Sequence, residues 1–329
     1  MSDPTPTPGL HHVTCIAGDP QQNIDFWVET LGLRLVKQSV NQDDPSTYHF
    51  FFADAEGTPG TSMTFFPHAN AGQGKVGSGQ VSRTAFRVPE GTLDYWESRF
   101  DECGVEYDER IERFGETVLQ FEDPDGLPVE LVEVEVSEDD PTVPWTEFVP
   151  EEHAIRGFHS VTLWLADPEP THELLEKMGL ENVGTEQAQG DTPGDQRTRF
   201  EASGPVGKYV DVLPTVSGGR QGAGTVHHVA FQTPTDEEQE AMRTMVSREG
   251  LRPSGQIDRH WFRSVYFREH SGVLFELATK EPGYTTDEPL EDLGGHLVLP
   301  GKFESRREQI EAGLPDVTVP EPETAEADD

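Results

Sequence analysis

Two short runs of the sequence each place two adjacent histidines between apolar residues. The run at 10–13 reads Leu-His-His-Val, and the run at 226–229 reads Val-His-His-Val. A neutral imidazole is the commonest side-chain ligand of transition metals, often together with a carboxylate. A lone histidine in a strand is structural more often than not. The two runs therefore indicate a metal site only if the fold brings them together.

An internal repeat suggests how the fold can do so. Four segments begin with a short apolar strand, at about residues 9, 81, 157 and 225, and continue with apolar residues at helical spacing. A glycine closes each helix: Gly32, Gly104, Gly179 and Gly250. Strand-like runs bounded by turn residues follow. We therefore predict an α+β fold of four βαβββ modules with curved mixed sheets.

The repeat and the local composition also predict the order of parts along the chain. The stretch after the second module is acidic and contains prolines, which is typical of a linker. Signals for helices and strands weaken after the fourth module. The predicted parts are a flexible N-terminus at 1–8, a first domain at 9–136 with modules 9–67 and 80–136, a linker at 137–153, a second domain at 154–280 with modules 157–215 and 224–280, and a C-terminal arm with an acidic disordered tail at 281–329.

Alignment of the modules identifies two equivalent positions, one in each first strand and one in each last strand. Side chains at equivalent positions point to the same face of equivalent sheets. In module order, the first-strand residues are His12, Arg83, Ser160 and His228. The last-strand residues, each four positions after a glycine, are Thr64, Glu130, Asp211 and Glu276.

Pairing the first module with the fourth brings together His12, His228 and Glu276, with Thr64 in the fourth position. Two imidazoles and one carboxylate that leave open positions form the facial triad of non-haem Fe(II) oxygenases. The open positions allow a substrate and O2 to bind together. We therefore predict an Fe(II) site, although Mn(II) accepts the same ligands. The second and third modules contribute no histidine to these positions, and we interpret their pair as a lapsed copy of the site.

The charge of the chain excludes some partners. Lys+Arg is 24 and Asp+Glu is 62, which gives a net charge of −38. This charge repels phosphate, so we expect no nucleic-acid partner and no binding to an anionic membrane. A carboxylate-rich surface is typical of a halophilic protein, because salt screens the self-repulsion. With two cysteines, no signal peptide and no apolar run that spans a bilayer, we expect a cytoplasmic protein.

Beyond these patterns, the sequence resembles a known family. The matching runs are GLHHVTCIAGDP at 9–20, NQDDPSTYH at 41–49, GTSMTFF at 60–66, GTVHHVAF at 224–231 and DRHWFRSVYFR at 258–268. They resemble the vicinal-oxygen-chelate superfamily, which includes glyoxalases, bleomycin resistance proteins and extradiol dioxygenases. Within it, the likeness over about residues 9–315 is to two-domain ring-cleaving dioxygenases that act on hydroquinones.

The resemblance implies an activity and a set of residues around the substrate. The activity is extradiol-type cleavage of a hydroquinone, or of a catechol, by O2 at an Fe(II) held by His12, His228 and Glu276. The catalytic residues implied around the substrate are His11, Thr14, His227, Arg259 and Tyr266. An arginine there can steady a phenolate, and a tyrosine hydroxyl can hydrogen-bond to a substrate oxygen.

Several questions stay open at this point. A glyoxalase-like isomerase or lyase usually has a fourth protein ligand, and Thr64 in that position speaks against it. A ligand-sequestering resistance protein would not need the triad at all. His49 and His260 are candidate proton carriers without an assigned role. The ring substituents, the cleavage position and the oligomeric state are undetermined, and a homo-oligomer is compatible with the sequence.

Overall fold

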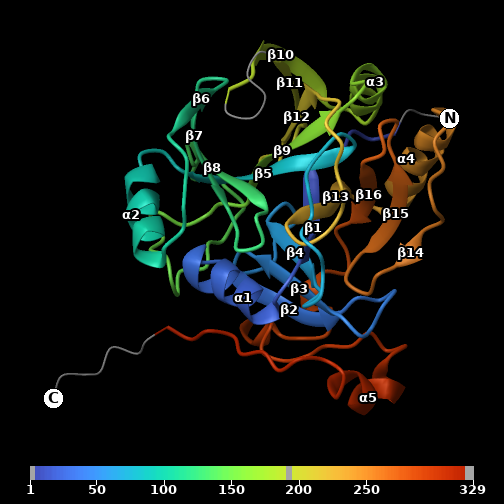
Figure 1. Ribbon diagram of the computed structural model, residues 1–329. Helices are drawn as coiled ribbons and strands as arrows, with labels where there is room; N and C mark the ends of the chain where they lie inside the picture. The colour runs from blue at the N-terminus through green and yellow to red at the C-terminus, as the bar shows by residue number, and fades with distance from the viewer. Residues whose placement is uncertain (1–3, 190–194, 323–329) are drawn as a thin grey trace.

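The computed structural model of the chain describes residues 4–189 and 195–322, and it confirms the predicted α+β fold of four modules (Figure 1). The first module contains β1 Leu10–Ala17, α1 Pro20–Asp25 with a π-helical turn Phe26–Thr30, β2 Arg34–Val40, β3 Tyr48–Ala53 and β4 Ser62–Pro67. The second contains β5 Gln80–Pro89, α2 Leu93–Cys103, β6 Ile111–Arg113, β7 Glu116–Glu122 and β8 Pro128–Val134.

The other two modules repeat this order. The third contains β9 Phe158–Leu165, α3 Glu169–Lys177, β10 Glu181–Gln187, β11 Gln196–Glu201 and β12 Tyr209–Pro214. The fourth contains β13 Thr225–Thr233, α4 Asp236–Arg248, β14 Ile257–Asp258, β15 Arg263–Arg268 and β16 Leu274–Thr279. A short helix, α5 Arg307–Glu311, lies in the C-terminal arm.

The modules combine into two eight-stranded sheets. One has the strand order β14-β15-β16-β13-β1-β4-β3-β2, so the first and fourth modules form it; we call it the 1/4 sheet. The other has the order β10-β11-β12-β9-β5-β8-β7-β6 and is the 2/3 sheet. The predicted domain ranges 9–136 and 154–280 thus each supply one module to each sheet. That these two ranges are separate domains remains a prediction.

One hydrophobic core includes residues of both sheets. Asp19 caps α1 by accepting a hydrogen bond from Gln22 N at 2.9 Å, which starts the helix where its apolar face can reach the sheet. Trp27 follows on that face and is fully buried. Its ring centroid lies 5.0 Å from that of Phe65 in the 1/4 sheet and 5.9 Å from that of Phe86 in the 2/3 sheet. Apolar burial therefore holds the two sheets against each other. No helix within the described ranges has the length and apolarity to cross a membrane.

The two ends of the described chain pack on the modules. The expectation of a flexible N-terminus to residue 8 is wrong for Thr7, because its side chain is buried and its hydroxyl donates to Gln232 O at 2.8 Å. The C-terminal arm (red in Figure 1) runs along β2, where Val298 N donates to Gln38 O at 2.8 Å. The predicted acidic tail includes residues 323–329, which lie outside the described residues.

A buried ion pair attaches this arm to the 1/4 sheet. Lys37 on β2 is 0% exposed and donates to Asp287 Oδ1 at 2.5 Å and to Glu288 Oε2. Asp287 Oδ2 in turn accepts from Trp261 Nε1 at 2.9 Å. A buried charge needs a partner, because leaving one uncompensated carries a large desolvation penalty.

We expect Lys37→Ala to lower the free energy of unfolding by about 3–5 kcal/mol, because it leaves two largely buried carboxylates without their cation. Denaturant unfolding monitored by tryptophan fluorescence measures this change. The control is Lys75→Ala, at an exposed position. A loss below about 1 kcal/mol, the scale of surface pairs, would contradict the structural role.

Candidate metal centre

Three side chains of the 1/4 sheet converge on one point. His12 Nε2 lies 3.3 Å from His228 Nε2 and 3.3 Å from Glu276 Oε2, and His228 Nε2 lies 2.9 Å from the same carboxylate oxygen. All three side chains are buried. Ligand atoms about 2.1 Å from an ion and at right angles to each other lie about 3 Å apart, so these separations fit one shared cation. The structure thus brings together the three predicted ligands from opposite ends of the chain.

The strand register explains the convergence. β1 and β13 pair antiparallel with His12 opposite Ala230, and β13 and β16 pair parallel with Ala230 opposite Glu276. Paired residues share a face of the sheet, and so do residues two apart on one strand. His12, Glu276 and His228 therefore point to the same side. Tyr266 stands opposite Glu276 on β15 and joins this row.

Two β-bulges turn the neighbouring histidines toward the same site. Between Leu10 and His12 the register advances by one residue on β13 but two on β1, which leaves His11 as the extra residue. The opposite shift leaves His227 as the extra residue on β13. Without a bulge, adjacent side chains would face opposite sides of the sheet.

The extra histidines orient the ligands through matched contacts. His11 Nδ1 lies 2.8 Å from His12 Nδ1, and His227 Nδ1 lies 2.8 Å from His228 Nδ1. Burial lowers the pKa of His11 to about 3 and that of His227 to about 4, so both rings are neutral and can accept a hydrogen bond at Nδ1. A ligand histidine that donates from Nδ1 keeps the lone pair of Nε2 for a metal.

The carboxylate completes a donor set suited to a cation. Burial alone would raise the pKa of Glu276, but the adjacent His12 and His228 hold it well below its ordinary value. Glu276 Oε1 accepts from Ser264 Oγ at 2.5 Å, whereas Oε2 is buried and has no hydrogen-bond donor of good geometry among the described residues. A buried anionic oxygen that faces two imidazole nitrogens fits a bound divalent metal.

A cavity of about 360 Å³ opens above these ligands. Its aromatic wall is made by Phe51, Phe66, Trp261 and Phe262. Its polar lining includes His227, Arg259 and Tyr266, with the Arg259 guanidinium 5.3 Å from the centroid of the Tyr266 ring. The cavity has the size and the mixed apolar and polar lining of a site for a small aromatic molecule.

These features can be compared with known proteins. A sequence model of the Glyoxalase/Bleomycin resistance protein/Dioxygenase superfamily matches residues 9–131 and again residues 132–277. The chain belongs to this superfamily. The double match agrees with the repeat of modules, and it confirms the resemblance found in the sequence.

Relatives within the superfamily match almost the whole chain. The chain is 45% identical over 312 residues to the "Putative ring-cleaving dioxygenase MhqO" of Bacillus subtilis, and the alignment covers 94% of this chain and 96% of that protein. It is 35% identical over 320 residues to the "Chlorohydroquinone/hydroquinone 1,2-dioxygenase" of Sphingobium indicum, covering 94% and 97%. A crystal structure titled as a "putative dioxygenase" from Bacillus subtilis matches with a TM-score of 0.89 at 43% identity, over 96% of this chain and 99% of that one.

The residues that the sequence assigned to catalysis lie at different depths in this superfamily member. His227, Arg259 and Tyr266 line the cavity. His11 lies behind His12, outside the lining. Thr14 is fully buried, and its Oγ1 lies 2.7 Å from Thr64 Oγ1. The positions are thus established, while the role of each residue remains a prediction.

Other lining residues were not assigned from the sequence. His49 lines the cavity, lies between Phe51 and Phe66, and places Nε2 3.1 Å from Thr64 Oγ1. Phe51, whose ring contacts His49, pairs with Thr64 in the sheet, so the strand register could have indicated that His49 lies near Thr64. His260, by contrast, is turned away, with Nε2 2.8 Å from Asp287 Oδ2.

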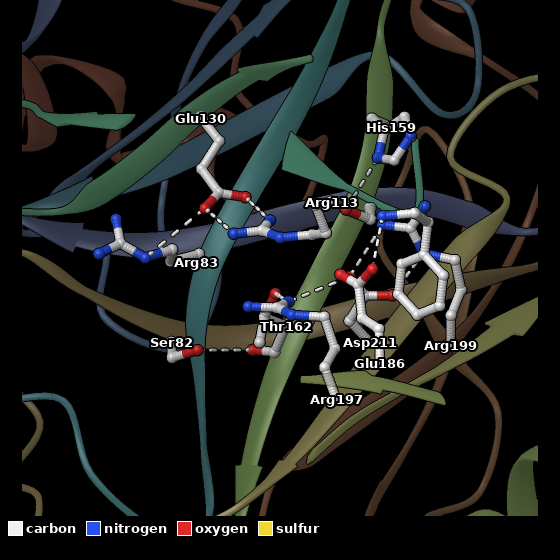
Figure 2. A network of polar contacts seen from close by, with 12 residues as sticks. Ser82, Arg83, Arg113, Glu130, His159, Thr162, Glu186, Arg197, Arg199 and Asp211 are labelled. Atoms are coloured by element: carbon white, nitrogen blue, oxygen red, sulfur yellow. Dashed lines mark hydrogen bonds and ion pairs between the residues drawn. The ribbon is translucent and has the colours of Figure 1, made fainter. Parts of the chain in front are cut away.

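The 2/3 sheet has a corresponding network without a metal triad (Figure 2). Glu130 accepts two hydrogen bonds from Arg113, at 2.6 and 2.9 Å. Asp211 accepts from Arg197 at 3.0 Å and from Arg199 at 2.8 and 3.0 Å. Within the described ranges, the triad of the 1/4 sheet is the one group of three His, Cys, Asp or Glu side chains whose ligand atoms are close enough to share an ion. Arginine guanidinium groups thus occupy this part of the 2/3 sheet in place of a metal ion, and its interpretation as a lapsed copy stays a prediction.

We expect His12→Ala and Glu276→Ala to abolish stoichiometric metal binding, because each removes one of three ligands. Anaerobic reconstitution followed by metal analysis should give about one ion per chain in the unaltered protein and about a tenth of that or less in each variant. His270→Ala, at an exposed position, is the control. Full metal content in His12→Ala would show that the ion binds elsewhere.

We also expect the metal-free protein to lose stability as the pH falls from about 6.5 to 4.5. His11 and His227 take up protons near pH 6.5 when the chain is unfolded, but only near pH 3 and 4 when it is folded. Acid therefore favours the unfolded chain. Denaturant unfolding at several pH values measures the slope. His227→Gln should reduce it and the exposed His270→Gln should not; equal slopes in all three proteins would contradict this account.

Proposed function

We propose that this chain is an Fe(II)-dependent ring-cleaving dioxygenase that acts on hydroquinones by extradiol-type cleavage. Catechols are the second substrate class, and Mn(II) is the alternative metal, since it accepts the same ligands. The observation that carries the proposal is the buried triad of His12, His228 and Glu276 beneath an aromatic-walled cavity. The names of the relatives support ring cleavage of hydroquinones: one is titled "Putative ring-cleaving dioxygenase MhqO" and the other "Chlorohydroquinone/hydroquinone 1,2-dioxygenase".

The bound ion would supply the charge that acidifies a coordinated hydroxyl and a route for electrons between the ring and O2. The protein side chains would bind and orient the substrate, exclude water and stabilise charge. The aromatic wall of Phe51, Phe66, Trp261 and Phe262 would hold the flat ring and exclude water. This leaves orientation and charge stabilisation to the polar lining.

Arg259 and Tyr266 are placed to stabilise oxygen atoms of the substrate. Burial alone would lower the pKa of Arg259, but Tyr266 and Asp43 raise it, so the guanidinium keeps its charge. Burial raises the pKa of Tyr266, so its hydroxyl keeps its proton and can donate a hydrogen bond. Both groups can therefore face a phenolate or a reduced oxygen species with hydrogen-bond donors.

His227 can act as a further donor. If His228 donates from Nδ1 to His227 Nδ1, the proton of the neutral His227 ring must be on Nε2. His227 lines the cavity, so this N–H group can donate a hydrogen bond to a substrate oxygen. His11 would play the equivalent orienting role behind His12, and Thr14 would hold Thr64 in place.

The fourth position of the site argues against an isomerase. Thr64 occupies it, and its hydroxyl already contacts Thr14 at 2.7 Å and His49 at 3.1 Å. A hydroxyl in such contacts does not replace the carboxylate that a glyoxalase-like isomerase uses as its fourth metal ligand. Zinc or nickel with isomerase activity and no O2 uptake would instead support the glyoxalase-like alternative. Tight ligand binding without turnover would support a sequestering protein.

The decisive experiment is O2 consumption by anaerobically reconstituted protein. We expect the Fe(II) form to consume about one O2 per hydroquinone, with ring-opened product, and the His12→Ala and Glu276→Ala proteins to be at least ~10³-fold slower. Catechol tests the second substrate class, and the Mn(II) form tests the metal. Normal turnover by a protein without either ligand would refute the assignment.

We further propose that the chain is halophilic, since a net charge of −38 repels itself unless salt screens it. The expected cytoplasmic location stays a prediction. The melting temperature should rise by roughly 10 °C or more between about 0.1 and 2 M KCl. Sucrose, which stabilises without screening charge, is the control. An unchanged melting temperature in KCl would count against salt adaptation.

A further inference from the structure

The mouth of the cavity is formed by a loop of the first module. This loop, at 41–47, connects β2 to β3, and Asn41, Gln42 and Asp43 line the cavity. Asn41 Oδ1 accepts a hydrogen bond from Asp43 N at 2.9 Å, which shapes the start of the loop. The loop thus presents the Asp43 carboxylate at the entrance.

Asp43 is paired with the guanidinium of Arg259 in the fourth module. Arg259 Nη2 lies 3.0 Å from Asp43 Oδ2, and Nη1 lies 3.3 Å from Oδ1. Gln42 Nε2 donates to Arg259 O at 2.8 Å beside this pair. The Asp43 side chain is 76% exposed and that of Arg259 17%, so this two-pronged pair lies at the rim of the cavity and orients the guanidinium there.

This pair carries the permanent side-chain charges of the cavity lining. Among the described residues that line the cavity, Arg259 has the one permanent positive charge and Asp43 the one carboxylate. The remaining lining consists of aromatic and aliphatic side chains, two amides and several imidazoles. An anionic substituent on the ring would meet a guanidinium whose charge Asp43 already balances, with a like charge beside it.

We infer that Asp43 is a specificity-determining residue that restricts the cavity to hydroquinones whose ring substituents carry no charge. This inference rests on the proposed function, because it names the substrate class of that same site. Asp43 acts by occupying Arg259 and by repelling a second anion, while the aromatic wall accepts uncharged substituents of similar size.

The test compares two ligands of matched size. One is 2,5-dihydroxybenzenesulfonate, whose sulfonate is anionic and a poor metal ligand, and the other is the uncharged 2,5-dihydroxybenzenesulfonamide. We expect the unaltered protein to favour the sulfonamide by about ten-fold or more in kcat/KM, mainly through KM. Asp43→Asn should reduce this ratio by about three- to five-fold, the range for an exposed ion pair, since it frees Arg259 and removes the repulsion.

Two further variants distinguish the pair from general charge effects. Asp44→Asn removes the same charge one residue away, where the carboxylate contacts Ser46 rather than Arg259, and should leave the ratio unchanged. Asp43→Glu keeps the charge and should keep the preference. Equal use of both ligands by the unaltered protein, or equal ratios in Asp43→Asn and Asp44→Asn, would overturn the inference.

A binding measurement separates this inference from the proposed reaction. Calorimetry under anaerobic conditions gives the affinity of the metal-loaded protein for both ligands, whether or not they are turned over. A sulfonamide preference that Asp43→Asn removes supports the inference even if hydroquinone is not cleaved. If hydroquinone is cleaved but neither ligand is preferred, the proposed function stands and the role of Asp43 is refuted.

Discussion

The antiparallel pairing of β1 with β13 is the interaction on which the site depends. It joins the first and last modules of the chain into one sheet and sets His12 and His228 on the same face. Its two bulges then turn His11 and His227 toward their neighbours instead of away from them. A shift of this register by one residue would place His12 and His228 on opposite faces of the sheet.

The two sheets show how one scaffold can carry different charges. The same pairing, with bulges at Ser82 and His159, joins β5 to β9 in the 2/3 sheet. There, Glu130 and Asp211 stand where the ligand carboxylate would, and arginines neutralise both. Burial alone would raise the pKa of Glu130, but Arg113 and Arg83 hold it well below its usual range. Both sheets therefore balance buried carboxylates. The 2/3 sheet does so with guanidinium groups, and the 1/4 sheet with a site suited to a metal ion.

The cavity wall is supported from outside the modules. Trp261 and Phe262 come from the fourth module, and Phe262 lies 4.9 Å from the His12 ring between centroids. Trp261 is hydrogen-bonded to Asp287 of the C-terminal arm, which Lys37 of the first module holds. The arm thus connects the two modules that share the site.

The sequence by itself determined the four modules and the α+β class and predicted the three candidate ligands, because strand alternation and helical spacing are local and the modules repeat them. It could not decide which side His11 and His227 face, since a bulge depends on the partner strand. It named His49 only as a candidate proton carrier without a role, and it did not single out Asp43 or Asp287, whose neighbours are distant in sequence. Those contacts were decided by the tertiary structure, because only the closed sheet and the packed arm bring together side chains that local patterns leave unrelated.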